Sequence, residues 1–318
     1  MTAIILVNWN GADDTLACLY SLLGAQGSFF VVVVDNASED DSLERIKAFA
    51  AEYEAQMSVK VLALDDNYGF AIGNNKGIRY ASQFAPESYL LLNNDTEVAP
   101  DFLEELLAFS NKYPEFRALA PRINFFYDKD EIWDCGGTIR FGKRDNRYAN
   151  KHGEALEGKE YLPITFISGC ALFFYPELLD EEKRVFTERY FFGEEDFEFS
   201  MRMRKKGLKM ACVTASQIYH KVGRSRNKMK AIAHVGKYYM YYLNRLITLR
   251  THLPRLQYTF IKMLYIPQCF RYFYSVNHSV KISWKMLLRL LREVRTKQGV
   301  NRADFRRLMI DNTYFDND

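Results

Sequence analysis

Four short apolar runs in the first third of the chain constrain its fold more than any other feature. They span residues 3–7, 29–34, 59–64 and 89–92. Segments with helical spacing lie between these runs and after the last one, at residues 15–23, 41–55, 69–84 and 101–113. Strands that alternate with helices at this spacing form parallel βαβ units. The pattern therefore predicts an α/β fold with a mostly parallel sheet flanked by helices.

Oxygen-bearing side chains follow each of the four runs. These pairs are Asn8 with Asn10, Asp35 with Asn36, Asp66 with Asn67, and Asn93 with Asp95. An ordinary Asn/Asp turn explains any one strand end alone. Parallel strands, however, place all four ends on one edge of the sheet, where ligands bind in open α/β folds. Carboxylate and amide oxygens suit Mg²⁺ or Mn²⁺, so a divalent-metal and phosphate site is predicted there.

Glycines at positions 69, 73 and 77 follow the third run. They would allow the start of the helix to approach a ligand closely. Their spacing matches neither the dinucleotide-binding fingerprint nor the phosphate-binding P-loop. The sequence thus disfavours a dinucleotide enzyme and an NTPase.

A second acidic cluster lies at residues 193–202, and a basic segment begins at His220. Acids at a helix N-terminus stabilise the helix dipole, and Glu198 with Arg202 has the spacing of a surface ion pair. The functional alternative is a carboxylate base that faces a second substrate. His220 is followed by Lys221, Arg224 and Arg226, which favours a diphosphate contact or a metal ligand shared with Asp95.

The charge is divided unevenly along the chain. Residues 1–219 carry a net charge of −12 and residues 220–318 a net charge of +15, giving the total of +3. This shift predicts a domain boundary near 225. The five cysteines show no metal-ligand spacing, which fits reduced thiols in a cytosol-facing protein. No signal peptide or transmembrane helix is expected.

The ordered set of motifs resembles glycosyltransferase family 2, inverting enzymes with the GT-A fold, and within it the rhamnosyltransferase-like branch. The motifs are Val7-Asn8-Trp9-Asn10, Val34 to Asp40, Asn67 to Ala71 with Asn74-Asn75, Leu92 to Asp95, Gly193 to Arg202, and His220 to Ser225. The resemblance covers about residues 1–250. It implies a Rossmann-like GT-A catalytic domain over 1–225, with a nucleotide-sugar half (1–115) and an acceptor half (116–225). A helical, basic C-terminal region would occupy 226–318.

The resemblance also implies roles for matched residues. Asp196 would be the general base, with Glu195 and Arg202 beside the acceptor. Asp95 would bind the metal at the family's D-x-D position, where Asn93 replaces the first acid, and His220 would bind the metal or the diphosphate. The donor-binding residues would be Asn8, Asn10, Asp35, Asn36, Asn67, Gly69, Asn74, Asn93 and Asn94. The implied reaction transfers a sugar from dTDP-rhamnose or a UDP-sugar to a glycan or lipid-linked acceptor in bacterial surface-polysaccharide synthesis.

The basic C-terminal region is expected to form helices at about 229–251 and 284–297, separated at Pro254 and Pro267. These helices pack on the catalytic domain, and their basic and aromatic residues suit an anionic membrane surface. We therefore predict a cytoplasmic protein, peripheral at the inner face of the cell membrane, with no nucleic-acid partner; a homodimer is left open.

Two rival functions remain to be weighed. A sugar-nucleotide nucleotidyltransferase would need a basic, glycine-rich loop after the first strand, and residues 8–13 contain no basic side chain. A catalytically inactive sugar-nucleotide-binding protein on the same fold stays open, because sequence alone does not distinguish it from an enzyme.

Overall fold

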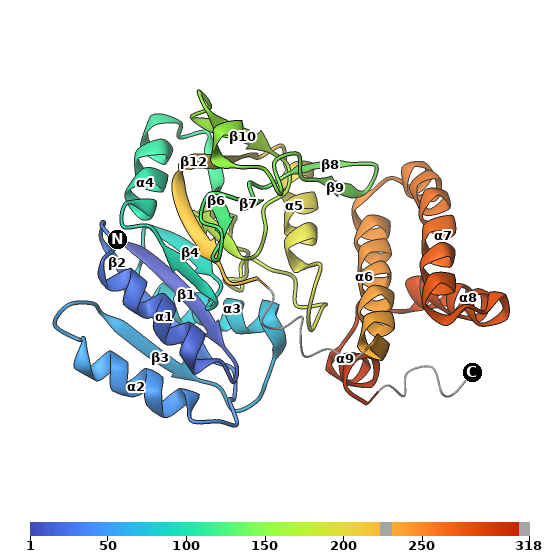
Figure 1. The fold of residues 1–318 in the computed structure, drawn as a ribbon, viewed down its shortest axis with the longest axis horizontal. Coiled ribbons are helices and arrows are strands. Elements are labelled where there is room, and N and C mark those ends of the chain that lie inside the picture. The colour runs from blue at the N-terminus through green and yellow to red at the C-terminus, as the bar shows by residue number, and fades with distance from the viewer. Residues whose placement is uncertain (223–230, 312–318) are drawn as a thin grey trace.

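A large mixed sheet organises most of the chain in the computed structural model, which describes residues 1–222 and 231–311 (Figure 1). The strand order is β10-β12-β6-β11-β4-β1-β2-β3, with β5 paired to β12 and β7 to β6. The strands are β1 (Thr2–Asn8), β2 (Phe29–Asp35), β3 (Val59–Ala63), β4 (Ser88–Leu92), β5 (Thr96–Val98), β6 (Phe116–Phe125), β7 (Ile132–Asp134), β10 (Tyr161–Ile164), β11 (Ala171–Phe174) and β12 (Lys209–His220).

The four predicted strands form one parallel part of the sheet, in the order β4-β1-β2-β3, and β6 with β12 forms a second parallel pair. The predicted α/β fold is confirmed, and the sheet as a whole is mixed, with both parallel and antiparallel pairs. β11 runs antiparallel between β4 and β6, and β5, β7 and β10 are antiparallel to their partners. The short connection from β6 to β7, for example, contains no helix and reverses the direction of the chain.

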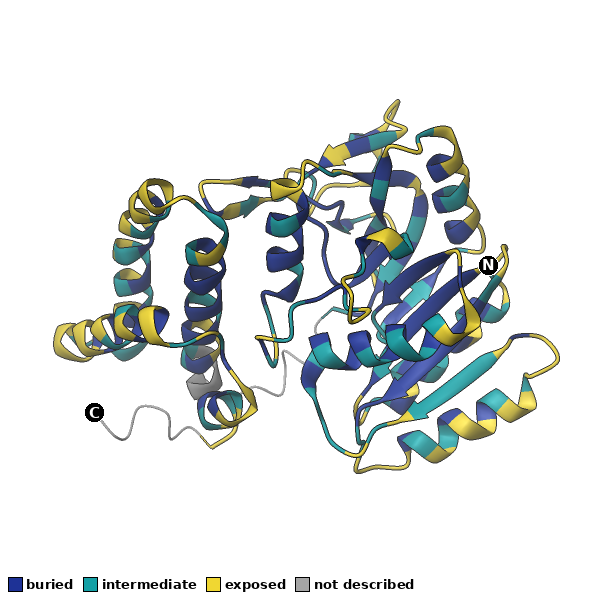
Figure 2. Ribbon diagram, turned by 180° about the vertical axis from the view of Figure 1, so that it is seen from behind, coloured by how far each residue is buried: buried dark blue, intermediate teal, exposed yellow. Residues whose placement is uncertain are grey.

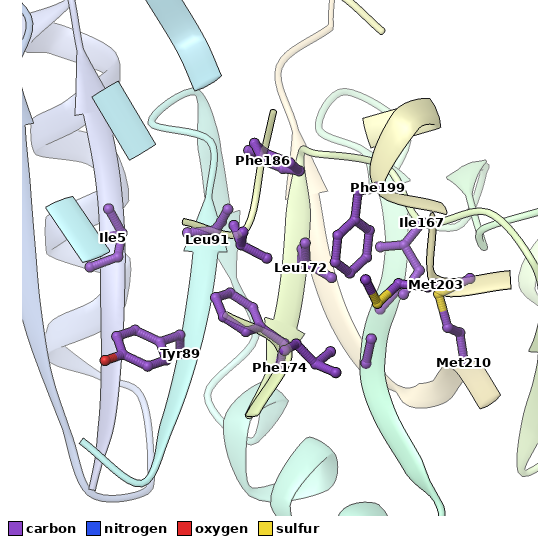
Figure 3. Close-up of a cluster of buried hydrophobic side chains, with 14 of the residues drawn as sticks. Ile5, Tyr89, Leu91, Ile167, Leu172, Phe174, Phe186, Phe199, Met203 and Met210 are labelled. Atoms are coloured by element: carbon purple, nitrogen blue, oxygen red, sulfur yellow. The ribbon is translucent and has the colours of Figure 1, made fainter. Parts of the chain in front are cut away.

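Helices cover both faces of the parallel strands, which explains why these strands are continuous apolar runs. On one face, Ile4, Val31 and Leu90 belong to the same core as residues of α1 (Ala12–Leu23), α2 (Ser42–Glu52) and α4 (Phe102–Lys112). On the other face, Ile5 and Leu91 pack with residues of α3 (Gly69–Ala81) and α5 (Glu195–Lys205), including Phe199 in Figure 3. The period-two alternation of the strands thus divides the core into two layers.

The C-terminal helices form a third apolar cluster beside α5 (Figure 1). They are α6 (Ala231–His252), α7 (Arg255–Asn277), α8 (Val280–Thr296) and α9 (Arg302–Met309). Tyr239 and Leu243 of α6 share this cluster with Phe197 and Met201 of α5. The basic region is therefore packed against the helix that carries the second acidic cluster.

Three local expectations need correction. Pro267 lies inside α7 and does not end it. Proline has no backbone N–H to donate to the carbonyl four residues earlier, but this face of the helix is exposed, so that carbonyl can bond to water. Helix α9 was not predicted. Residues 140–158, which the predicted helices and strands do not cover, contain strand β9 (Lys143–Asp145) paired to β8 (Thr138–Arg140) and a short 3₁₀ turn, Gly153–Leu156.

The predicted domain boundary at 225, with Arg224 and Arg226, lies outside the described residues. Among the described residues, no helix is long and apolar enough to cross a membrane.

Candidate functional site

The carboxyl ends of β4, β1 and β2 are joined by a chain of side-chain hydrogen bonds. The amide of Asn94 donates to the hydroxyl of Thr15 in α1 (2.9 Å), and Thr15 donates to Oδ1 of Asn8 (2.8 Å). Nδ2 of Asn8 then donates to Oδ1 of Asp35 across the strand pair (2.9 Å). Three of the four predicted polar strand ends therefore converge on one edge of the sheet.

The fourth strand end, that of β3, is connected to this hydrogen-bond network through Asn36. Its Nδ2 donates to Oδ1 of Asn67 (3.0 Å), and its own Oδ1 accepts the backbone N–H of Tyr68 (3.0 Å). Oδ1 of Asn67 also accepts the backbone N–H of Gly69, the first residue of α3 (2.9 Å). Asp66 instead pairs with Arg302 of α9. The polar network continues to the loop before α3, as the sequence predicts.

Burial separates the predicted donor-binding residues into two groups. Asn8, Asp35, Asn36 and Asn74 are buried, and the amide of Asn74 donates to the carbonyl of Phe70 (2.9 Å). Those that keep exposed surface are Asn10, Asn67, Asn93 and Asn94. The first group holds loops in place, whereas the second group can meet a ligand.

Ser38 is a network residue absent from the predicted donor-binding set. Its hydroxyl donates to Oδ1 of Asp35 (2.6 Å) and accepts from Nδ2 of Asn8 and the backbone N–H of Asn10 (both 3.0 Å). Its backbone N–H donates to the other oxygen of Asp35 (3.0 Å). The available signal was an Asp followed three residues later by Ser, a spacing typical of side-chain-capped turns. Thr15 carried no comparable signal, because it lies within a helix.

Two of the glycines allow α3 to pack closely against its neighbours. Gly69 has a φ of +80°, and a Cβ atom there would lie 2.0 Å from the carbonyl oxygen of Phe191. A Cβ atom on Gly77 would lie 2.5 Å from Ile5 in β1 and 2.8 Å from Val34 in β2. These positions let α3 lie close to the sheet and to the segment before α5.

Asp95 and His220 meet at the start of β5 and the end of β12. Nε2 of His220 lies 3.1 Å from Oδ1 of Asp95, and the ring of His220 packs against Trp133. Burial acts to raise the pKa of Asp95, but the hydrogen bond and charge of His220, with the charge of Lys221, hold that pKa below its usual value. The geometry brings the two predicted metal ligands into direct contact.

Asp95 and His220 have the chemistry of ligands for a divalent cation. Among the described residues, no group of three or more His, Cys, Asp and Glu side chains forms a metal cage. Nδ1 of His220 is buried and has no hydrogen-bond partner among the described residues. Mg²⁺ and Mn²⁺ commonly take one or two protein ligands and complete their sphere with phosphate and water oxygens. A carboxylate and an imidazole side by side fit that kind of site.

Asp196 lies in the first turn of α5, where its carboxylate accepts the backbone N–H of Gly169 (3.2 Å). It keeps some exposed surface, whereas its neighbour Glu195 is buried and has one oxygen without a partner among the described residues. Burial raises the pKa of both carboxyls, that of Glu195 to about 8, with the charge of Asp196 adding to the effect. A partly exposed base candidate thus lies beside a buried carboxyl whose raised pKa favours its protonated form.

The turn at residues 169–170 connects α5, the helix that carries Asp196 (the acid helix), to the carboxyl ends of β4, β1 and β2 (the strand edge). The carbonyl of Cys170 accepts the backbone N–H of Asn93 (2.8 Å), while Gly169 bonds to Asp196. Burial, then the charges of Asp95, Asp134 and Asp196, raise the pKa of the Cys170 thiol. The two predicted halves of the site are therefore neighbours across residues 169–170.

The C-terminal helices hold the backbone in front of Asp196. Glu194 adopts a left-handed conformation with a φ of 77°, and its carboxylate binds the guanidinium of Arg245 in α6 at two points, one of them 2.9 Å long. Arg245 also lies over the ring of Phe197, 3.4 Å from its centre, and the neighbouring Asn244 donates to the carbonyl of Gly193 (3.2 Å). Sequence reasoning missed this clamp, because nothing local links positions 194 and 245.

The ion pair predicted between Glu198 and Arg202 is present, but Glu198 is buried and Arg202 is half-buried, so the pair does not lie on the open surface. Glu198 also contacts Nε2 of His252 (2.9 Å), and Arg202 donates to the carbonyl of Val185 (2.6 Å). The described contacts of Arg202 are therefore with the protein's own backbone and with Glu198.

Comparisons with known proteins show what the chain is similar to in sequence. The family model described as Glycosyl transferase family 2 matches residues 3–182. The chain is 24% identical to the low-salt glycan biosynthesis hexosyltransferase Agl10 of Haloferax volcanii over 82% of this chain and 81% of that protein. It is 21% identical to the dTDP-rhamnosyl transferase RfbF of Shigella flexneri, over 79% and 81% of the two chains.

Solved structures show the same fold at lower identity. S. aureus TarS (residues 1–349) in complex with UDP-GlcNAc superposes with a TM-score of 0.59 at 15% identity, covering 98% of this chain and 82% of that one. The mannosyltransferase PcManGT of Pyrobaculum calidifontis, solved with GDP-Man and Mn²⁺, gives a TM-score of 0.57 at 14% identity over 93% and 75%. These neighbours confirm the predicted GT-A fold.

Proposed function

Because the chain belongs to glycosyltransferase family 2, we propose that it transfers a hexose from a nucleoside diphosphate to a hydroxyl group of a glycan or lipid-linked acceptor, with inversion at the anomeric carbon. The donors that we favour are dTDP-rhamnose and UDP-sugars. The similarity to RfbF and Agl10 supports a hexose donor and a role in glycan assembly.

The turn at residues 169–170 is the observation that carries this proposal. It places the carboxylate of Asp196 next to the strand edge that holds Asn93 and Asp95. A displacement at the anomeric carbon needs a base on the acceptor side and charge stabilisation on the leaving-group side. The two carboxylate sites flank this turn in that arrangement.

On the acceptor side, Asp196 would take the proton of the attacking hydroxyl group. General base catalysis of this kind contributes about 10²–10⁴-fold to the rate. The N–H of Gly169 orients the carboxylate, and Glu195 beside it stays protonated, which avoids two adjacent negative charges. Asp196 must be ionised to act, so its raised pKa makes transfer rise with pH.

On the donor side, the exposed amides of Asn93 and Asn94 would bind the sugar nucleotide, and the buried Asn8 and Asp35 keep the floor of the site fixed. Asp95 and His220 would hold a divalent cation, which when bound neutralises charge on the diphosphate. Lys221 has its ammonium near Glu97 (2.9 Å) and Asp14 (3.7 Å), so it balances the acidic edge.

A donor screen tests the function. The protein is incubated with dTDP-rhamnose, UDP-sugars and GDP-mannose, each with Mg²⁺, Mn²⁺ or EDTA, and release of the nucleoside diphosphate and the shift in melting temperature are measured. We expect one donor to stabilise the protein and to be hydrolysed slowly only with a cation. Absence of both effects for every donor would refute the proposal, and stabilisation without hydrolysis or transfer would indicate an inactive binding protein.

A further inference from the structure

An exposed apolar stripe runs along α7. Leu256, Phe260, Met263 and Leu264 recur at the spacing of one helical face and are exposed by 87%, 51%, 56% and 40%. The opposite face of the helix carries Tyr265 and Phe273, which are buried in the C-terminal cluster. Figure 2 shows the outer surfaces of α7 and α8 largely exposed. A row of large apolar side chains in water is a feature of interaction surfaces.

Basic grooves flank this stripe on both sides. The groove between α7 and α8 has a volume of about 1010 Å³, and its basic lining residues are Arg250, Arg255, Lys262, Arg292 and Arg295. The groove on the other side, of about 680 Å³, lies against the β8–β9 hairpin and α5, and its basic lining residues are Arg140, Arg204, Lys205 and His252. The apolar stripe is thus bordered by positive charge.

Part of this charge forms no ion pair among the described residues. Residues 255–297 contain nine Lys and Arg residues but a single acid, Glu293, which binds Arg289. Among the described residues, no carboxylate forms an ion pair with Arg255, Lys262 or Arg295, whereas Lys297 is bound to Asp304. These basic residues with no carboxylate partner in the described part of the chain therefore line the α7–α8 groove.

We propose that the stripe and the α7–α8 groove form a docking surface for anionic lipid bilayers, which goes beyond the proposed reaction. The apolar side chains would enter the boundary between headgroups and acyl chains, and the grooves would take the lipid phosphates. Trp284, on α8, is 49% exposed and packs on Phe270, and Leu288 on the same helix is 62% exposed. These residues extend the apolar surface to α8.

Charge complementarity selects the bilayer over a second copy of the chain. A twofold dimer through this surface would bring the same patch from both copies together, so the basic grooves would face each other. A polyanion such as RNA would use the cations, but it gives no reason for aliphatic side chains at positions 256, 263 and 264. A surface that is both anionic and apolar beneath accounts for both features.

Vesicle sedimentation of the full chain provides the test. Vesicles of phosphatidylcholine alone are compared with vesicles that contain phosphatidylglycerol at a mole fraction of about one third. We expect binding to the anionic vesicles only, weakened by added salt. Arg255→Gln/Lys262→Gln should lower the partition coefficient by about tenfold or more, since each basic residue near an anionic surface contributes about fivefold. Leu256→Gln/Met263→Gln should lower it by about tenfold through lost apolar burial.

Matched controls separate this surface from general electrostatics. Lys47→Gln/Lys159→Gln removes the same charge from exposed positions elsewhere and should leave binding nearly unchanged. All variants are checked for an unaltered melting temperature. Equal binding to both vesicle types, or to neither, would overturn the proposal. So would a dimer in light scattering that Leu256→Gln/Met263→Gln converts to monomer, or binding to oligonucleotides in place of vesicles.

The outcome is independent of the proposed reaction. Asp196→Asn should bind anionic vesicles as the parent protein does, because residue 196 lies in the acid cluster and not on α7 or α8. Vesicle binding without donor turnover would leave the docking surface standing and refute the enzyme function. Donor turnover without vesicle binding would support the enzyme function and refute the docking surface.

Discussion

The two sides of the candidate site are held in different ways. On the strand edge, Asn8, Thr15 and Asp35 bond to one another within two consecutive βα units. On the acid side, the segment before Asp196 has two consecutive residues with positive φ, Gly193 and Glu194, and is fixed by Arg245, about 50 positions further along the chain. The strand edge is a local construction, whereas the acid helix depends on the C-terminal helices.

This difference gives the C-terminal region a second role. A left-handed non-glycine residue costs about 1–3 kcal/mol and persists only where its surroundings enforce it. The bidentate contact from Arg245, together with Asn244 on the carbonyl of Gly193, supplies that enforcement. We infer that changes in α6 alter the position of Asp196 while leaving the donor edge intact.

The largest expected effect is loss of turnover in Asp196→Asn. The amide cannot accept the proton, so the rate should fall by about 10²–10⁴-fold while donor binding remains. Asp101→Asn makes the same chemical change at an exposed position just before α4 and should retain normal rates. Steady-state kinetics and a donor titration measure the two quantities. Turnover of Asp196→Asn equal to that of the control would remove Asp196 as the base.

Arg245→Met should destabilise the protein by about 3–5 kcal/mol, because it leaves the carboxylate of Glu194 buried and unpaired. Arg302→Met breaks an exposed ion pair with Asp66 and should cost less than about 1 kcal/mol. Urea unfolding measures both.

The double variant Glu194→Gln/Arg245→Met should recover part of the loss, since no unpaired charge remains. If the Arg245→Met protein is assayed under conditions in which it is folded, kcat should be lower than in the parent protein, while the dissociation constant of the donor should change little. A loss of donor affinity as large as the loss of kcat would contradict the separation between the two sides.

The two sides also differ in how far the sequence predicts them. Asn8, Asp35, Asn67 and Asn93 could be grouped because parallel strands always end on the same edge. The antiparallel insertion of β11 and the pairing of Glu194 with Arg245 could not be derived. Both depend on contacts between distant segments, for which composition and periodicity hold no signal. The sequence also does not reveal which of these polar residues are buried. Asn8 and Asn94 are equivalent in the sequence pattern, but Asn8 is buried and Asn94 is half-buried.

The buried acid on the acceptor side predicts an unusual pH dependence of stability. Burial raises the pKa of Glu195 from 4.5 to about 8 in the folded protein. Between these values the folded state keeps a proton that the unfolded state has released. Stability should therefore fall as the pH rises from about 5 to 8, by up to about 1.4 kcal/mol per pH unit, and level off above 8.

Glu195→Gln removes this titration. Its stability relative to the parent protein should increase from pH 5 to 8 and stay constant at higher pH, as measured by urea unfolding at each pH. Glu157→Gln, at an exposed position, should give a curve parallel to that of the parent. A parallel curve for Glu195→Gln as well would show that Glu195 is ionised in the folded state.

The smallest effect is expected on the strand edge. Thr15→Val keeps the shape of the side chain but removes the donor to Asn8 and the acceptor for Asn94, at a cost of about 1–3 kcal/mol. The control, Thr259→Val, loses only a bond to its own helix at an exposed position and should change stability by less than about 0.5 kcal/mol. Because Asn94 lies on the donor side, Thr15→Val should weaken donor binding and leave kcat nearly unchanged. A fall in kcat with unchanged donor affinity would mean that the strand edge and the acid helix act as one unit.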